Sequence, residues 1–92
     1  MSGRLVAGVP ANASPEQLIN IGPKVAAMLT RIGVTTAGEL DDLGAVVAYH
    51  QICAATGTSH LMLLYALHGA LTGRNVLDLD DATRAALRRE AE

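Results

Sequence analysis

The spacing of hydrophobic residues predicts a series of short helices. Between Pro23 and Gly33, apolar side chains occupy positions 25, 28, 29 and 32, the spacing of one buried helix face. The run from about Ser59 to Leu71 is hydrophobic on nearly every side, which is typical of a helix at the centre of a bundle. No strand pattern occurs along the chain. The pattern therefore predicts an all-α fold, a compact bundle of five to six short helices.

Capping residues place several helix ends. Ser14 followed by Pro15 predicts a first helix that runs to about Asn20. Thr36, with Glu39 three residues later, predicts a capping box at the start of a third helix, after the one that Pro23 opens. A fourth helix is expected over Ala45 to Ala55. The glycines expected to end helices are Gly33, Gly44, Gly57 and Gly73.

Two further features concern the C-terminal half. Gly69 lies inside the expected central helix, where its missing side chain lets a neighbouring helix approach. A last helix is expected to begin with acids and end with arginines, the order that complements the helix dipole. We expect its charged side chains to form a solvent-exposed face of Asp–Arg pairs. Alternatively, the arginines form a basic edge that binds nucleic acid or an acidic partner. These residues are Asp78, Asp80, Asp81, Arg84, Arg88 and Arg89.

Composition points to one domain with some apolar surface. A chain of 92 residues has no material for a second core, so we expect a flexible tail over residues 1–13 and one helical domain over 14–92. With 2% aromatic residues, the core must be aliphatic around Tyr49 and Tyr65. Charged residues are 17% of the chain, below the roughly 25% of ordinary soluble proteins, which hints at self-association or docking.

Charge and cysteine content limit the choice of partners and compartment. The net charge of -2 argues against a protein that grips nucleic acid by charge alone. Cys53 is the only cysteine, which excludes an internal disulfide and fits a cytoplasmic protein. The apolar run at 61–67 is far shorter than the roughly 20 residues that span a bilayer, so no membrane association is expected.

The turn at Ile21-Gly22-Pro23 is the first candidate binding site. It presents the N–H groups of Gly22, Lys24 and Val25 at a helix N-terminus, where a phosphate or a partner's carbonyl or carboxylate can accept from them. Contact with DNA there would read the backbone and not the sequence. A second such turn, at 43–46, has no basic residue near it. The nearby acids Glu39, Asp41 and Asp42 favour a turn that only organises packing.

The sequence contains no recognisable set of catalytic residues. No catalytic carboxylate pair, Ser-His-Asp order or phosphate-binding glycine loop occurs, so we expect no enzyme and no cofactor. His50 and Cys53 are three residues apart on one expected helix and could supply two ligands to a metal ion. The signal is weak because no second pair of ligands accompanies them. His60 and His68 are interpreted as surface or interface residues.

Three stretches carry a family resemblance. They are Ile21 to Lys24 with Gly33 to Thr36 and Glu39-Leu40, then Leu43 to Tyr49, then Leu63 to Leu71. Residues Leu18 to Leu43 resemble a helix-hairpin-helix motif, and the chain from Leu18 to Leu79 resembles the C-terminal domain of the TfoX/Sxy family. The resemblance implies an all-helical domain that in the family is attached to a separate α/β N-terminal domain, in proteins linked to natural competence and transcriptional control.

The chain departs from the family pattern at three positions. In the family that the chain resembles, a polar residue is usual at the position of Met62, an acid at that of His68 and a tryptophan near that of Val76. Because this chain differs there, these three residues are the candidate interface residues. We therefore expect a non-catalytic protein-interaction module. Its partner would be a transcription factor, a separate TfoX N-terminal-like domain or a second copy of the chain. The alternative is weak, sequence-independent DNA binding through the backbone of the turn.

Overall fold

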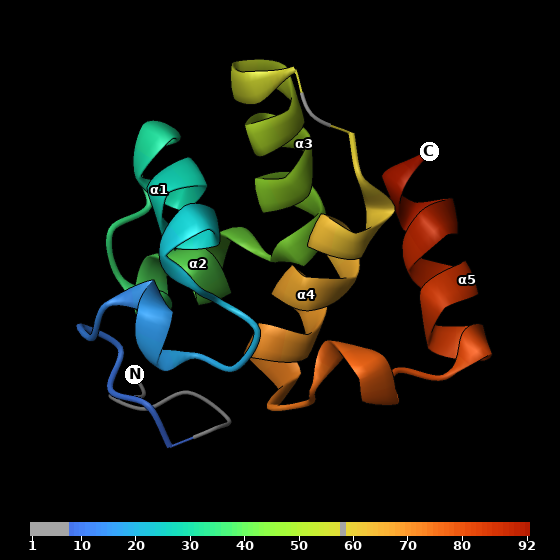
Figure 1. Ribbon diagram of the computed structural model, residues 1–92, viewed down its shortest axis with the longest axis horizontal. Coiled ribbons are helices and arrows are strands. Elements are labelled where there is room, and N and C mark those ends of the chain that lie inside the picture. The colour runs from blue at the N-terminus through green and yellow to red at the C-terminus, as the bar shows by residue number, and fades with distance from the viewer. Residues whose placement is uncertain (1–7, 58) are drawn as a thin grey trace.

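The computed structural model describes residues 8–57 and 59–92, which fold into five α-helices and two single turns of 3-10 helix (Figure 1). The prediction of an all-α bundle of five to six short helices is confirmed. The α-helices are α1 (Pro23–Arg31), α2 (Ala37–Leu43), α3 (Ala45–Thr56), α4 (Leu61–Thr72) and α5 (Asp81–Ala91). The 3-10 turns are η1 (Pro15–Gln17), ahead of α1, and η2 (Val76–Asp78), between α4 and α5.

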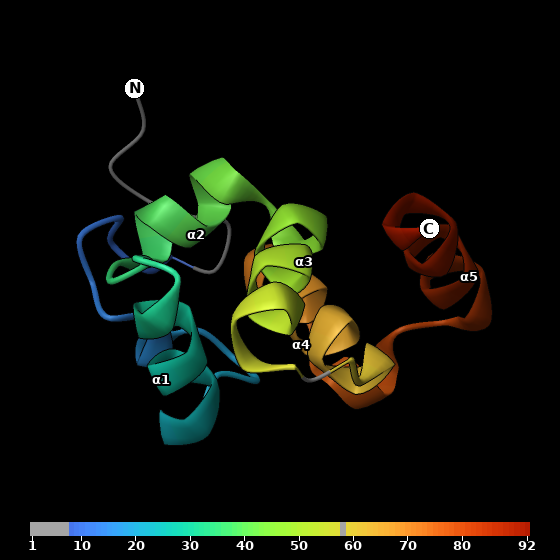
Figure 2. The same ribbon diagram turned by 90° about the horizontal axis from the view of Figure 1, so that it is seen from above.

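Helices α3 and α4 form the middle of the molecule, with α1 and α2 on one side and α5 on the other (Figures 1 and 2). The prediction that the apolar run forms the central helix is confirmed, since residues 63–67 of α4 are buried together with Gly69 and Ala70. Leu64 and Leu67 are completely excluded from solvent. Burial on nearly every side explains why this helix lacks a polar face.

Local signals set the ends of α1 and α2. Gly33 follows α1 with a φ of 84°, a left-handed conformation that glycine adopts without strain. Thr36 caps α2 by accepting from the Glu39 N–H at 3.1 Å, and the Glu39 carboxylate accepts from the Thr36 N–H at 3.2 Å. The predicted capping box is therefore confirmed. Leu29 of α1 and Leu40 of α2 are fully buried beneath these caps.

The helix expected from Ser14 to about Asn20 is wrong. Only the turn η1 forms, and Leu18 already has extended backbone angles. The reason lies in Asn20, which adopts a left-handed φ of 73° and turns its amide toward the loop after α4. Its Nδ2 donates to the carbonyl of Arg74 at 2.8 Å, and its Oδ1 accepts from the N–H of Val76 at 3.0 Å. These long-range hydrogen bonds replace the last turns of the expected helix.

Gly69 has a different role from the one expected. A side chain there would lie 2.5 Å from both the Arg74 carbonyl oxygen and the Asn20 Nδ2. The groups that need the space are thus a loop carbonyl and an asparagine amide, and not a neighbouring helix. Gly69 allows the Asn20 bridge to lie directly against α4.

The N-terminal stretch is described from Gly8 onward. In the first turn of α2, the N–H groups of Ala37 and Gly38 donate to the carbonyls of Ala13 and Ala11 at 2.8 and 2.7 Å. The described end of the expected tail over 1–13 therefore lies against α2. Residues 1–7 of that expected tail are outside the described residues, so the tail stays a prediction.

The acids ahead of α5 divide between two elements. Asp80 caps α5, since its carboxylate accepts from the Thr83 N–H at 2.8 Å. Asp78 belongs to η2 and not to the start of α5, which corrects the prediction. The break arises because the Asn75 side chain accepts from the Leu77 N–H at 2.9 Å and closes a separate turn. No helix in the described ranges is long and apolar enough to cross a membrane.

Candidate binding surfaces

The N-terminus of α1 presents the three residues predicted from the turn. Gly22 is the N-cap, makes no side-chain cap and is exposed, as is Lys24, while Val25 is half-buried. The first N–H of α1 with a helical partner is that of Ala26, which donates to the Gly22 carbonyl at 3.0 Å. The N–H groups of Lys24 and Val25 thus lack a carbonyl partner within the helix, as at any helix start.

One of the acids expected near this turn is already engaged. The Glu39 carboxylate accepts from the Thr35 N–H at 2.7 Å and from the Thr35 hydroxyl at 3.1 Å, in addition to its bond in the capping box. The hydrogen bonds from Thr35, ahead of those from Thr36, hold the pKa of Glu39 below its ordinary value. Asp41 and Asp42, on the same helix, are exposed. Lys24 therefore belongs to a region with more acids than bases.

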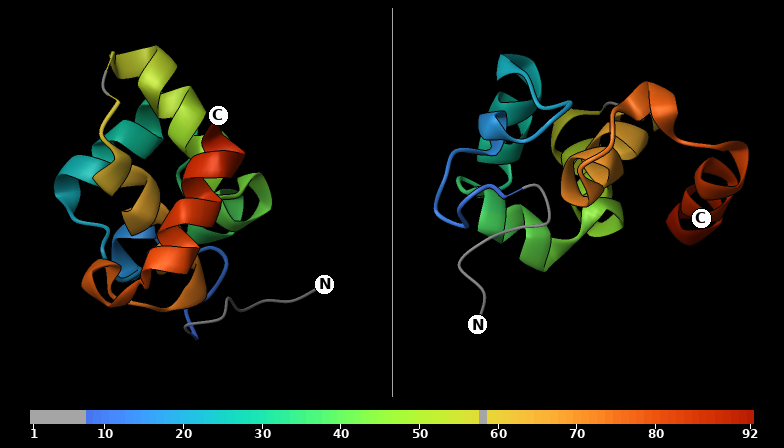
Figure 3. Two further views of the ribbon diagram at one scale, coloured as in Figure 1. Left: turned by 90° about the vertical axis from the view of Figure 1, so that its right-hand side faces the viewer. Right: turned by 90° about the horizontal axis from the view of Figure 1, so that it is seen from below.

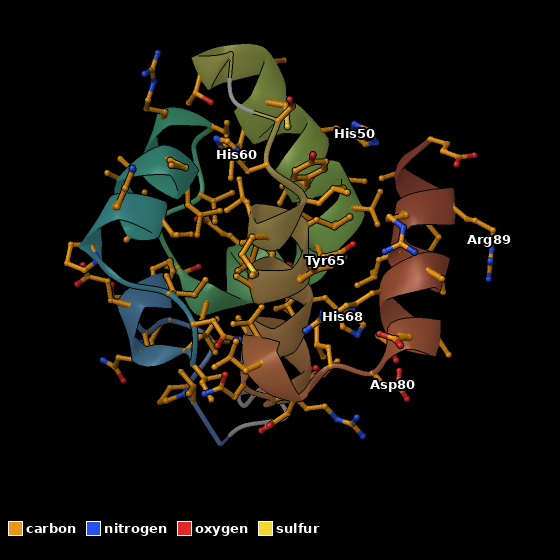
Figure 4. All side chains as sticks on the ribbon, turned by 45° about the vertical axis from the view of Figure 1, so that its right-hand side comes forward. His50, His60, Tyr65, His68, Asp80 and Arg89 are labelled. Carbon is orange, nitrogen blue, oxygen red and sulfur yellow. The ribbon has the colours of Figure 1, made fainter. Side chains whose placement is uncertain are left out.

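The structure does not bring Met62, His68 and Val76 onto one surface. Met62 and His68 are six residues apart on α4, so they lie about 120° apart around the helix. Met62 is exposed in the first turn, while His68 is half-buried on the side that faces α5 (Figure 4). Val76 is half-buried in η2 and packs against the core. Their role as interface residues stays a prediction.

A cluster around Tyr65 joins α4 to α5. The Arg88 guanidinium donates to the Tyr65 hydroxyl at 2.9 Å, and the Arg84 guanidinium lies 5.5 Å from the centre of the Tyr65 ring. Arg84 also donates to the Val76 carbonyl at 3.4 Å. The expectation that Arg84 and Arg88 pair with Asp80 and Asp81 is therefore wrong. Arg89 reaches away from the rest of the molecule (Figure 4).

This cluster was missed from the sequence because Tyr65 and Arg88 are 23 residues apart. The available signal was the four-residue spacing of Arg84 and Arg88, which places both on one side of a helix. That spacing did not reveal which neighbour the side chains would meet.

Two hollows lie beside α4 and α5, and the first of them borders the cluster. One, of about 280 Å³, lies where α3, the start of α4 and the end of α5 meet; it is lined by Tyr49, Leu61, Arg88, Ala91 and Glu92. The other, of about 310 Å³, is more polar and is lined by His68, Thr72, Arg74, Leu79 and Thr83. The first hollow has an apolar wall because it exposes part of the Tyr49 ring and the Leu61 side chain.

Tyr49 is mostly buried beneath the first hollow. Burial, followed by its hydrogen bond and charge interaction with Cys53, raises the pKa of the Tyr49 hydroxyl. Cys53 is half-buried and packs against the core. Within the described residues, no group of three histidine, cysteine or acidic side chains is arranged to hold a metal ion.

Comparisons with known proteins identify relatives of this domain. Two crystal structures from Listeria monocytogenes resemble it, one of an uncharacterized protein in a triclinic form and one of a protein of unknown function in a tetragonal form. Both are 32% identical, with TM-scores of 0.79 and 0.75. The first match covers 86% of this chain and 90% of the relative, and the second covers 80% and 91%.

Among curated proteins, no match was found. The family model described as the TfoX C-terminal domain matches residues 12–91, nearly the whole chain. This match also includes α5 and the cluster around Tyr65. The chain therefore belongs to the TfoX C-terminal domain family.

Proposed function

We propose that this domain is a non-catalytic interaction module that contacts another protein where α4 begins. One observation carries the proposal: Leu61 and Met62, adjacent in the first turn of α4, are 40% and 54% exposed. Leu61 also lines the hollow beside α5. Contiguous exposed apolar side chains next to a hollow are typical of a protein-binding surface, whereas single exposed ones are common everywhere. Ile19, Val47 and Leu77 are exposed too, but none of them lines this hollow or is adjacent in sequence to a residue that does.

The family resemblance suggests the setting in which this contact is made. We place the domain in transcriptional regulation in the cytoplasm, with a transcription factor or a separate TfoX N-terminal-like domain as partner. A second copy of the chain is the other partner that this apolar surface would fit.

A photo-crosslinking amino acid at position 62 of the full chain tests the proposal in living cells. We expect a crosslinked product of one discrete mass, because a specific partner would cover Met62. The matched control places the same amino acid at Ala27, which is exposed on α1 at the other side of the molecule. Equal products from both positions, or none from position 62, would contradict the proposal. A product of twice the chain mass would make the partner a second copy.

The second candidate function is weak DNA binding at the turn before α1. It is favoured by the N–H groups of Lys24 and Val25, which the α1 helix leaves open beside an exposed ammonium group. Fluorescence anisotropy with a short labelled duplex at low salt tests it. Lys24→Gln should weaken binding and lower the slope of log affinity against log salt by about one. Equal binding by Lys24→Gln would exclude this role for the turn.

A further inference from the structure

Helix α5 is joined to the rest of the molecule by apolar contacts of Leu87 and Ala91 and by polar contacts of its arginines. Leu87 is the one residue of α5 that is buried. Its long side chains Arg84 and Arg88 contact Tyr65 and the Val76 carbonyl. In the view from below, α5 stands at the outer side of α3 and α4 (Figure 3). Two guanidinium groups are thus drawn to one tyrosine at the edge of the core.

These two positive charges have no negative partner in the described part of the chain. Their contacts are a hydroxyl, an aromatic ring and a backbone carbonyl, all neutral. The Nε of Arg84 is buried without a hydrogen-bond partner. Like charges four residues apart on a helix disfavour each other by about 0.2–0.5 kcal/mol. An anionic group beside them would remove this repulsion.

Arg88 has donors left for such a group. A guanidinium carries five N–H donors, and one of them is used for the Tyr65 hydroxyl. Arg88 is exposed and lines the 280 Å³ hollow. The remaining donors suit a carboxylate, which guanidinium groups bind through two parallel hydrogen bonds. Glu92 lines the same hollow, but no ion pair joins it to Arg88 in the described residues.

The wall of the hollow opposite Arg88 is apolar. Leu61 and Tyr49 form this wall, and Met62 is exposed next to Leu61, while Ala91 lines the hollow from the same helix as Arg88. The hollow is slightly smaller than the roughly 300–1,000 Å³ of small-molecule sites, and it is open to solvent. Its size suits an apolar side chain of a partner, while a neighbouring acid of the same partner would reach Arg88.

We propose that the hollow between the start of α4 and the end of α5 binds an acidic amphipathic segment of another protein. In this complex an apolar side chain packs on Leu61 and Met62, and a carboxylate accepts from Arg88. Arg84, whose guanidinium lies 5.5 Å from the centre of the Tyr65 ring, adds a second positive charge nearby. The proposal rests on the proposed interaction function and specifies the chemistry of the partner. The charge complementarity of the two arginines is what selects an acidic partner.

Calorimetric titration of the full chain with a synthetic helical peptide tests this. The probe carries leucine and glutamate on one face, and its twin has glutamine in place of glutamate. We expect the glutamate peptide to bind about tenfold or more tightly than its twin at low salt, which is the contribution of one charge-assisted hydrogen bond. The difference should shrink as salt is added. Equal affinity for both peptides would overturn the proposal.

The arginines of α5 supply a matched control. Arg88→Gln should abolish the preference for the glutamate peptide, whereas Arg89→Gln, which removes the same charge from the outward side, should keep it. Loss of the preference in both variants would show a general charge effect and overturn the proposal. Leu61→Ala removes the apolar contact while keeping both Arg88 and Tyr65, and it should also weaken binding of the glutamate peptide, so a folding defect of Arg88→Gln would not mask the result.

Two outcomes separate this proposal from the wider function. If the photo-crosslink at position 62 persists unchanged in Arg88→Gln, the interaction function stands and the acidic partner is excluded. If a short DNA duplex binds in an Arg88-dependent way and the glutamate peptide does not, the surface recognises phosphate and the proposal of an acidic protein is overturned.

Discussion

The hairpin region, residues 14–43 with η1, α1 and α2, differs from the α4–α5 side in how it is held together. In the hairpin region a capping box and a glycine turn close the helix ends, and Leu29 and Leu40 are fully buried. On the other side, α5 is attached by Leu87 and Ala91 and by arginine contacts with Tyr65. We therefore interpret the hairpin region as a packing unit and expect a partner to bind on the α4–α5 side.

This difference bears on the DNA hypothesis. A helix that is joined to the core by few apolar contacts opens at lower free energy than one with a fully buried leucine. Binding surfaces are commonly drawn from such less stable parts. We therefore expect recognition at α5 and a structural role for the turn before α1.

The largest expected effect compares one leucine from each region. Leu29→Ala should lower the free energy of unfolding by about 2–5 kcal/mol, because it leaves a cavity where a fully buried side chain was packed. Leu87→Ala should have a smaller effect on global unfolding, because α5 can detach while α3 and α4 stay packed. Urea denaturation with amide hydrogen exchange measures both. Equal global losses, with α5 still protected in Leu87→Ala, would contradict the comparison.

The next effect concerns the bridge between the two regions. Asn20→Ala should lower the free energy of unfolding by about 2–3 kcal/mol, because it leaves the Val76 N–H unpaired and places alanine at a positive φ. Asn20→Gly removes the same hydrogen bonds, but glycine adopts a positive φ without strain, so the loss of unfolding free energy should be smaller. Thermal unfolding monitored by circular dichroism distinguishes them. Identical melting of Asn20→Ala and the unchanged protein would mean that the bridge adds nothing to stability.

A smaller effect is expected at the cap of α2. Thr36→Ala should lower the free energy of unfolding by about 1 kcal/mol, the usual loss for a threonine N-cap. The change should be confined to α2 in amide hydrogen exchange and should leave peptide binding at α5 unaltered. A loss of peptide binding in this variant would show that the two regions are coupled and not separate.

The smallest effect is on acid stability. Hydrogen bonds from Thr35 and Thr36 hold the pKa of Glu39 below its ordinary value of 4.5. Its contribution to stability is therefore complete above that pH and is lost as the pH falls toward the lower folded value. Glu39→Gln should flatten this part of a plot of melting temperature against pH. If the melting temperature at acidic pH is the same in Glu39→Gln and in the unchanged protein, the hydrogen bonds from Thr35 to the carboxylate do not persist in solution.

The fold could be predicted from the sequence where its signals are local. Thr36 and Glu39 are three residues apart. The glycines that end α3 and α4 directly follow the last helical residues, and Gly33 comes two residues after the end of α1. The contacts of Asn20 could not be predicted in this way, because its partners lie 54 and 56 residues further on. When these contacts are not known, residues Ser14 to Asn20 have the sequence pattern of a helix. Gly69 then suggests a close approach of two helices.

The candidate site follows the same rule. The turn at Gly22 could be read from consecutive residues, and the structure shows the expected exposed helix start. The cluster of Tyr65, Arg84 and Arg88 requires α5 to fold back along α4, which no local pattern specifies. The sequence did indicate a basic edge for an acidic partner as an alternative, but it could not show that the arginines lack carboxylate neighbours.

The central claim is that recognition takes place at the α4–α5 side and that the hairpin region supports it. Amide and arginine side-chain shifts of the full chain, followed by NMR during titration with the glutamate peptide, test this most directly. We expect the first and largest shifts at Leu61, Met62 and Arg88, with none at Gly22, Lys24 and Val25. Shifts that begin at Gly22, Lys24 and Val25 while α5 stays unchanged would contradict the account.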